Sequence, residues 1–237
     1  MLQSIRGLVL QHIKYLDKKN ILKIYTLEHG IQSYSVYISH SKSSKIKPAY
    51  IQALNQIEFT ADVHRNRDIQ NIRDIHVTHI YQSLFSDMAK NCIAVFLNEV
   101  LIKCLKEQAA NKELFFFLCN KLSQLDVSAK NEANFHLVFL LELSSYLGFQ
   151  PDAGYTPTRN LFDLQEGIFI DKVPEHPYYT DSETSLYLQK LFIERENYAC
   201  SAKERSEVLN ALLLLYRLHI PNFGELKSLP ILKEVLA

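Results

Sequence analysis

The side chains best suited to bind a ligand lie in the first third of the chain, where basic residues alternate with tyrosines. The basic candidates are Lys14, Lys18, Lys19, Lys23, Lys42, Lys45, Lys47, Arg65 and Arg67, and the tyrosines among them are Tyr15, Tyr25, Tyr34, Tyr37 and Tyr50. Lysine and arginine neutralise phosphates, and an exposed tyrosine ring stacks on a nucleobase. Tyr34 is in phase with Val36 and is predicted to be core, whereas Tyr37 is predicted to face outward. The pattern favours nucleic-acid binding.

The distribution of charge agrees with this interpretation. The whole chain has a formal net charge of zero, but the part up to Ile80 has eleven lysines and arginines against six acidic residues. That part therefore carries a net charge of +5 and the remainder −5. A basic segment beside an acidic one indicates that a polyanion would contact the first. The alternative is that an imbalance of this size is ordinary scatter.

Sequence motifs for catalysis are absent. The chain contains no phosphate-binding Gly-x-x-x-x-Gly-Lys motif, no Gly-x-Ser-x-Gly and no Gly-x-Gly-x-x-Gly. His76 and His79 have a spacing that suits two metal ligands, but no further ligands follow at a recognisable distance. We therefore predict a protein that is not an enzyme, with no catalytic residues, no cofactor and no metal.

The four cysteines lie singly, as is typical of reduced thiols in the cytoplasm. The chain opens with no signal peptide, and its most apolar run, residues 135–149, is shorter than a bilayer span. We expect a cytoplasmic location and no contact with a membrane.

Short β-strands must position the basic residues. Strands are predicted at residues 7–15, 21–26, 31–39, 56–63 and 69–77, with Val9, Ile13 and Tyr15 sharing one face of the first. Gly30 supplies the positive φ of a hairpin turn, and isoleucines at 69, 72 and 75 break the alternation, which predicts a bulge or a short helical turn. Residues 40–48 are rich in serine and lysine and are predicted to form a mobile loop. Five short strands suit a closed barrel of the oligonucleotide-binding (OB) type.

After residue 79 the apolar period becomes that of helices. Helices are predicted from Asp87 to Gln108 and at residues 112–125, 130–147, 181–196, 203–218 and 228–236. Asn111, Asp181 and Ser201 are predicted N-caps, and Gly148 is a predicted C-cap. An irregular segment near 149–179 has the pattern of a hairpin at 161–173. The predicted fold class is α+β, with an OB-fold domain at 1–79 and an α-helical domain at 80–237.

Three segments of the chain resemble one known family. They are Gly7–Tyr15 (GLVLQHIKY), Leu22–Tyr34 (LKIYTLEHGIQSY) and Tyr216–Ser228 (YRLHIPNFGELKS). Their order resembles that in the bacterial RecO family of DNA-repair and recombination mediators, and the resemblance covers essentially the whole chain. It implies an OB barrel followed by a helical domain, without enzymatic turnover.

The resemblance also implies partners. Members bind single- and double-stranded DNA, anneal complementary strands, and act with RecR and with the acidic tail of the single-strand-binding protein so that RecA can load. Carried over by position, the DNA-facing residues are the nine basic candidates named above. The tail requires an apolar groove with a cation beside it; Arg217 or Lys227 near Phe223 are candidates that the sequence does not decide between.

The chain departs from the family in one respect. Many relatives carry a four-cysteine zinc module where this chain has residues 147–185, and here that segment contains no cysteine. We predict that Phe162 and Phe169 hold the hairpin by packing and that no zinc is bound. The rival interpretation is a protein-interaction adaptor whose lysines serve only solubility. A positive stripe with exposed tyrosines favours DNA, and scattered lysines around an apolar patch favour the adaptor.

Overall fold

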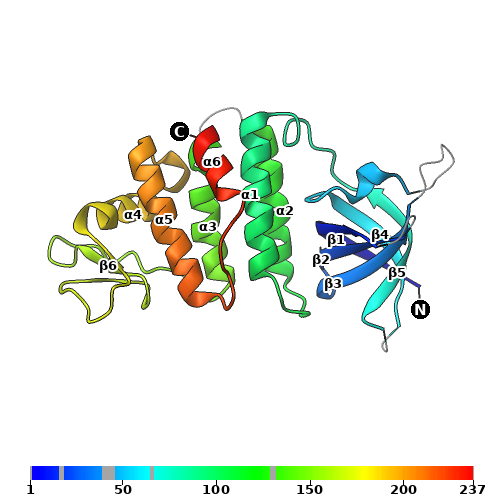
Figure 1. The fold of residues 1–237 in the computed structure, drawn as a ribbon, viewed down its shortest axis with the longest axis horizontal. Helices are drawn as coiled ribbons and strands as arrows, with labels where there is room; N and C mark the ends of the chain where they lie inside the picture. Colours follow the sequence, from blue (N-terminus) through cyan, green and yellow to red (C-terminus); the bar gives the residue numbers. More distant parts are fainter. Residues whose placement is uncertain (1, 16–18, 39–45, 65–66, 129–131, 237) are drawn as a thin grey trace. The chain divides into compact units, whose positions relative to one another are not determined.

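The computed structural model describes residues 2–15, 19–38, 46–64, 67–128 and 132–236 of the chain (Figure 1). A closed five-stranded barrel comes first and a mainly helical region follows it. The predicted α+β fold class, with an OB-like barrel before helices, is confirmed.

The barrel strands are β1 (Leu2–Lys14), β2 (Lys19–Thr26), β3 (Gly30–Tyr37), β4 (Gln56–Asp62) and β5 (Ile69–Val77). Their order around the barrel is β1-β2-β3-β5-β4. β1 is long enough to pair with β2 and β4, and β3 pairs with β5 in parallel to complete the closure. Closure pairs strand edges that an open sheet would expose to another chain.

The barrel core follows the alternation of its strands. Ile57, Phe59 and Ala61 of β4 are buried, while Glu58 between them is exposed. The Tyr34 ring meets the Phe59 ring edge-on at 4.7 Å between centroids, so the prediction that Tyr34 belongs to the core is confirmed. Thr60 of β4 pairs with Asp74 of β5, but the next residue, Ala61, pairs with Ile72. Arg73 is therefore the extra residue of the predicted bulge in β5.

The predicted alternation of the first strand is wrong. Val9 is fully buried, whereas Ile13 and Tyr15 are 45% and 62% exposed. The register of β1 against β2 shifts between Val9 and Gln11, which places an extra residue in the strand. Because side chains alternate with a period of two, one extra residue turns the rest of the strand to the opposite face.

Two predicted connections of the barrel have different outcomes. Gly30 has φ of +62° at the β2–β3 turn, as predicted. Residues 40–45 of the predicted mobile loop lie outside the described residues. The end of that loop is ordered by the core, because Ile46 and Ile51 pack into the barrel and residues Pro48–Ile51 form the 3-10 helix η1.

The helices of the remaining chain are α1 (Met88–Cys104), α2 (Lys112–Val127), α3 (Phe135–Tyr146), α4 (Ser182–Glu194), α5 (Ala202–His219) and α6 (Leu229–Val235), with 3-10 turns η2 (Glu132–Asn134) and η3 (Arg195–Asn197). α1 ends before the predicted Gln108, and α3 begins after the predicted residue 130. The caps are confirmed: Asn111 and Asp181 accept N–H groups of their first turns, and Ser201 forms a capping box with Glu204.

The chain forms two compact units. The first unit comprises Met1–Asp87 with Leu97–Val127, and the second comprises Met88–Phe96 with Ser128–Ala237. The predicted boundary after residue 79 follows the change from strands to helices, whereas the first unit also includes α2 and part of α1.

A small sheet in the second unit occupies the irregular segment. Its strands are β6 (Leu161–Asp163), β7 (Ile168–Ile170) and β8 (Tyr179–Thr180), in the order β7-β6-β8. The β6–β7 hairpin was predicted, but β8 was not. The Phe162 and Phe169 rings lie 4.9 Å apart, and the Phe162 ring lies 5.8 Å from that of Phe192 of α4, so the predicted aromatic packing is confirmed.

Clusters of metal-ligating side chains and helices that could span a membrane are both absent from the described part of the chain. No three or more histidine, cysteine, aspartate or glutamate side chains gather there as a metal site would require. None of the helices there combines the length and the apolar character needed to cross a bilayer.

Candidate nucleic-acid interface

One row of side chains crosses the outer face of the barrel at the end where β1 and β3 finish and β2 begins. Lys19 of β2 lies directly opposite Tyr37 of β3, and the Tyr15 N–H donates to the Lys19 carbonyl at 3.2 Å. Residues paired in this way share a face of the sheet. Tyr15, Lys19 and Tyr37 form what we call the tyrosine–lysine row. It combines two aromatic rings with one cation.

A groove of about 360 Å³ contains two members of this row. Its lining residues are Tyr15, Lys19, Ile21, Ser35, Arg67, Ile69 and Asn71. The parallel pairing of β3 with β5 places Ile69 opposite Ser33 and Asn71 opposite Ser35, which brings β5 into the groove. The lining therefore has two cations and no carboxylate.

The tyrosines divide between the core and this surface. Tyr15 and Tyr37 keep 62% and 65% of their surface exposed, and the Lys19 ammonium lies 6.0 Å from the centre of the Tyr37 ring. Tyr25 and Tyr34 are buried, and Tyr50 is half-buried against the barrel core. Tyr37 is exposed, as predicted. Of these five tyrosines, Tyr15 in the groove and Tyr37 beside it are the ones exposed enough to stack on a base.

The structure brings together a few of the nine predicted basic residues. Lys19 and Arg67 line the groove, and Lys23 lies further along β2 on the same face. Lys14 pairs with the buried Asn20, so it belongs to the opposite face of the sheet. Lys47 is exposed at the start of η1. The remaining four, Lys18, Lys42, Lys45 and Arg65, lie outside the described residues.

Arg67 is positioned by a residue that the sequence analysis did not select. The Gln70 side chain is buried, accepts the His64 N–H at 2.9 Å, and donates to the carbonyls of His64 and Arg67 at 2.9 and 2.7 Å. Because Gln70 satisfies three backbone groups, it fixes the turn that carries Arg67. A polar residue in phase with the inward isoleucines of β5 was the signal that could have identified it.

The other charged side chains of this turn balance one another. His64 Nε2 lies 3.1 Å from Asp62 Oδ1, and this hydrogen bond is the main cause that lowers the pKa of the Asp62 carboxyl. Arg73 lies 3.6 Å from the other Asp62 oxygen. The positive charge of Arg73 is therefore shared with a carboxylate, whereas no carboxylate lines the groove that contains Lys19 and Arg67.

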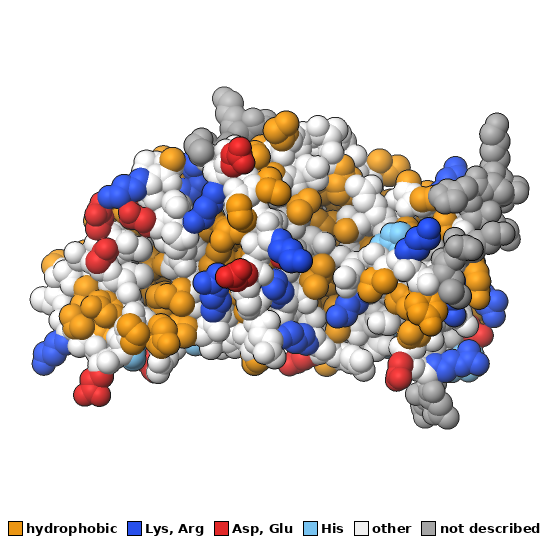
Figure 2. All heavy atoms as spheres, viewed as in Figure 1, with side chains coloured by type: hydrophobic (Ala, Val, Ile, Leu, Met, Phe, Trp, Pro, Cys, Tyr) orange, Lys and Arg blue, Asp and Glu red, His pale blue; other side chains and the backbone are white. Residues whose placement is uncertain are grey.

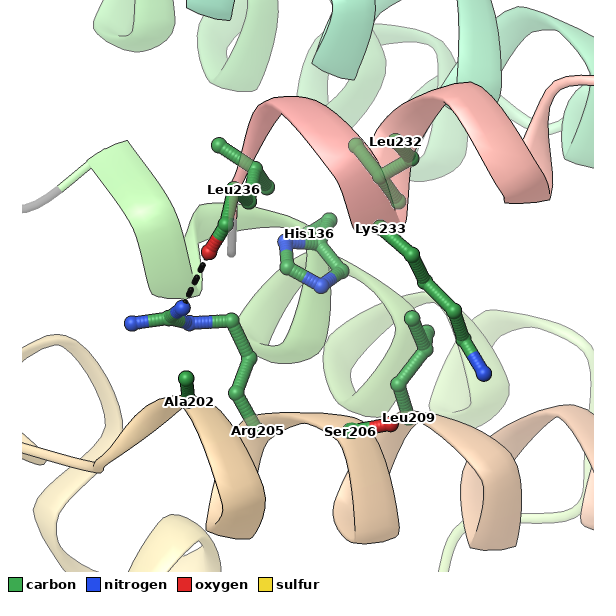
Figure 3. Close-up of a pocket in the computed structure, with 8 residues that line it drawn as sticks. All are labelled: His136, Ala202, Arg205, Ser206, Leu209, Leu232, Lys233 and Leu236. Atoms are coloured by element: carbon green, nitrogen blue, oxygen red, sulfur yellow. Dashed lines mark hydrogen bonds between the residues drawn. The ribbon is translucent and has the colours of Figure 1, made fainter.

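A second candidate site lies wholly in the second unit. A cavity of about 220 Å³ is lined by His136, Ala202, Arg205, Ser206, Leu209, Leu232, Lys233 and Leu236 (Figure 3). The imidazole of His136 is fully buried, and neither ring nitrogen has a hydrogen-bond partner among the described residues. Burial, and then the charge of Arg205, lower the pKa of His136 to about 3, so the ring is neutral.

The cations of this cavity are held at its edge. The Arg205 guanidinium donates to the Leu236 carbonyl and to Asn134 Oδ1, and Lys233 Nζ donates to Asn210 Oδ1 at 2.8 Å. The cavity can therefore take an apolar side chain while cations contact a nearby carboxylate. Phe223 does not offer such a site, because its ring is buried and lies 5.6 Å from that of Tyr216.

The exposed apolar residues of the second unit include several of the small sheet. Figure 2 shows hydrophobic side chains gathered over the β6 end of this unit, where Ile168, Val173 and Tyr178 are exposed. Exposed charged side chains of both signs, Asp171, Lys172 and Glu175, lie in the same segment of the chain.

Comparisons with known proteins cover both units. The chain matches the family model described as recombination protein O N terminal over residues 1–81 and the one described as recombination protein O C terminal over residues 85–230. It is 35% identical to a DNA repair protein RecO of Phocaeicola vulgatus, with 100% of each chain covered. It is also 35% identical to one of Bacteroides fragilis and 34% to one of Flavobacterium psychrophilum, with 99% and 98% of each chain covered.

Proposed function

This chain belongs to the recombination protein O family of DNA repair proteins, and from that premise we propose that it is a DNA-binding mediator of recombination. The observation that carries the proposal is the groove, which combines Lys19 and Arg67 with the exposed Tyr15. The exposed Tyr37 lies beside it, paired with Lys19 across the strands. Lys19 and Arg67 contact phosphates, and Lys23 extends the cationic face along β2. Double-stranded DNA contacts the same cations through its backbone.

The protein acts by binding and not by catalytic turnover. Cations that screen two phosphate backbones at once let complementary strands approach, and annealing follows. The resemblance described above supplies the remaining steps of the proposal: the protein acts with RecR in the cytoplasm and helps RecA to load on the strand. It needs no cofactor and no metal for these steps.

We further propose that the cavity of the second unit binds the acidic tail of the single-strand-binding protein. The cavity has the apolar lining and the adjacent cations that such a tail requires, with Arg205 and Lys233 beside Leu209 and Leu232. Lys233→Glu should weaken binding of a labelled acidic tail peptide at least about tenfold, because one attractive charge becomes repulsive. Unchanged peptide affinity would remove the cavity from the proposal.

A protein-interaction adaptor is the second candidate function. Ile13 and Ile69 are 45% and 41% exposed on the barrel, and exposed apolar side chains suit a protein partner. The two functions differ in their response to salt, because phosphate contacts release counterions and apolar contacts do not. The salt dependence of binding therefore discriminates between them.

The test is fluorescence-anisotropy titration of a labelled single-stranded oligonucleotide across a series of salt concentrations. About five phosphate contacts predict a log–log slope of about −3.5. Charge reversal of both groove cations, Lys19→Glu with Arg67→Glu, should make the slope shallower by about 1.4.

The matched control is Lys172→Glu, which reverses an exposed lysine of the second unit and should leave the slope unchanged. Equal loss of affinity in the control and in the double variant would place DNA elsewhere. Absence of binding at low salt would overturn DNA binding and leave the adaptor function.

A further inference from the structure

The three side chains of the tyrosine–lysine row are regularly spaced across neighbouring strands. Tyr15, Lys19 and Tyr37 stand on three neighbouring strand ends, in the order aromatic, cation, aromatic. Neighbouring strands lie about 4.8 Å apart, so the two tyrosine backbones are about 10 Å apart with Lys19 between them. The backbone hydrogen bond from Tyr15 to Lys19 and the β2–β3 ladder fix this spacing.

We propose that this row selects unpaired DNA: Tyr15 and Tyr37 each stack on a base of a single strand, and Lys19 contacts the phosphate backbone between those bases. The inference rests on the proposed function and adds a strand preference to it. The backbone of a single strand is flexible, so two bases within a short stretch can reach two rings whose backbones are about 10 Å apart. The two tyrosines therefore contact bases of the DNA strand, and Lys19 contacts its phosphate backbone between them.

Both rings are open to a base. Tyr15 and Tyr37 are more than half exposed, and Lys19 approaches Tyr37 at a distance of 6.0 Å from the ring centre, which leaves the rest of the ring surface available. Stacking uses the flat face of a base, and every base has such a face. The row should therefore bind strands of different sequence.

The same chemistry discriminates against duplex DNA. In a duplex the faces of each base are already covered by neighbouring base pairs, so the tyrosines have nothing to stack on. In a bound single strand, the edges that pair with a complement stay free, because the tyrosines contact only the faces. A strand held by the row can accept its complement, and the duplex that forms loses both stacking contacts. The row thus favours release of the annealed product.

Polar groups beside the row are partly engaged with one another. Ser35 Oγ donates to Asn71 Oδ1 within the groove, so the hydroxyl proton and the amide oxygen already have partners. Ile21 and Ile69 complete the lining and offer only apolar contact to a base or sugar. The selection is therefore between unpaired and paired strands and not between bases.

The test compares the affinity of the full-length protein for a single-stranded oligothymidine and for a duplex of the same length. Tyr15→Ala and Tyr37→Ala should each weaken single-strand binding about 5- to 100-fold, from the usual value of one stacking contact. Duplex binding should change less than about twofold. Tyr37→Phe should keep the wild-type preference, because the ring face is retained.

A second readout reports stacking directly. A strand carrying 2-aminopurine should lose fluorescence on binding the wild type, and much less on binding the variant with both alanines. Tyr178→Ala, which removes an exposed tyrosine of the second unit, is the matched control and should behave as wild type. Circular dichroism of each variant checks that the barrel is folded.

The outcomes separate this inference from the proposed function. If the alanine variants bind single strands as the wild type does while Lys19→Glu with Arg67→Glu weakens binding, the groove contacts phosphates only, and the proposal that the row stacks on bases is overturned. If the alanine variants weaken single-strand and duplex binding equally, the proposal that the row selects unpaired DNA is overturned. If the wild type binds neither DNA at low salt, the proposed function fails and the row with it.

Discussion

Asp126 shows how one carboxylate can fix the chain just after the barrel. The side chain is buried, and its two oxygens accept the backbone N–H groups of Gln82, Ser83 and Leu84 at 2.9, 2.7 and 2.7 Å. Burial opposes ionisation, but these hydrogen bonds outweigh it and hold the pKa of Asp126 below its ordinary value. The ionised form is therefore part of the fold.

The free energy of unfolding should depend on this group. Because the pKa of Asp126 is lower in the folded protein than its value of about 3.9 in an unfolded chain, the carboxylate stabilises the fold above that pH. The stabilisation is lost as pH falls through the folded value. Asp126→Asn should lower the free energy of unfolding by about 1–3 kcal/mol at pH 7, as for a buried hydrogen-bonding group.

Urea unfolding followed by circular dichroism at pH 7 and at pH 3 measures both effects. The difference in the free energy of unfolding between wild type and Asp126→Asn should be larger at pH 7 than at pH 3. Asp68→Asn removes an exposed carboxylate of the same unit and should change stability little. A difference that stays constant with pH would show that ionised Asp126 does not stabilise the fold.

At the scale of elements, the alternation of apolar and polar residues predicted much of the barrel. It gave the wrong face for the end of β1, where one extra residue shifts the register. The alternation of β4 identified Ile57, Phe59 and Ala61 as core residues, because that strand is regular over its buried part. In β1 the shift near Leu10 turned Ile13 and Tyr15 outward, and nothing local in the sequence marks it. That shift creates one end of the candidate groove.

The site itself depended on contacts between distant segments. Lys19 and Arg67 were both predicted from composition, but only the parallel pairing of β3 with β5 brings them to one groove. The buried Gln70 that positions Arg67 was marked in the sequence only by its phase with the inward Ile72, and its contacts with the His64 and Arg67 backbone depend on the folded turn. Likewise, the apolar pattern of α3 predicted a buried helix, but not that His136 would line a cavity.

The small sheet of the second unit gives a prediction at the same scale. Phe162, Phe169 and Phe192 are buried together, and the Phe169 and Phe192 rings lie 6.1 Å apart. Phe162→Ala removes one of three rings that all contact one another, so it should lower the stability of this unit by about 3–5 kcal/mol. Ile168→Ala changes an exposed residue of the same hairpin and should lower the stability of this unit much less.

Urea unfolding of the two variants should be accompanied by metal analysis of the wild type. Packing of three aromatic rings requires no metal, so we expect far less than one zinc per chain and no loss of stability on adding a chelator. One zinc per chain, or a chelator-induced loss comparable to that of Phe162→Ala, would contradict the interpretation that packing alone holds the hairpin.

At the scale of the whole molecule, the division into two units predicts which part of the chain folds with the barrel. Within the first unit, Gln56 Nε2 donates to the Cys119 carbonyl at 3.2 Å, Asn98 donates to the Leu10 carbonyl at 3.1 Å, and the Tyr25 ring stacks with that of Phe115. Leu8 and Leu10 are buried there as well. The outer face of β1 and β2 is therefore covered by residues that follow the barrel in sequence.

A fragment of residues 1–79 would keep every barrel strand but lose these partners. We expect it to melt at a lower temperature than a fragment of residues 1–127, or to aggregate, because apolar and polar groups of β1 and β2 become exposed without compensation. Thermal melting followed by circular dichroism measures this difference. Both fragments contain the whole tyrosine–lysine row, so the longer one should still bind single-stranded oligothymidine. Equal melting temperatures would mean that the barrel folds without α2, and that the boundary after residue 79 also limits the folding unit.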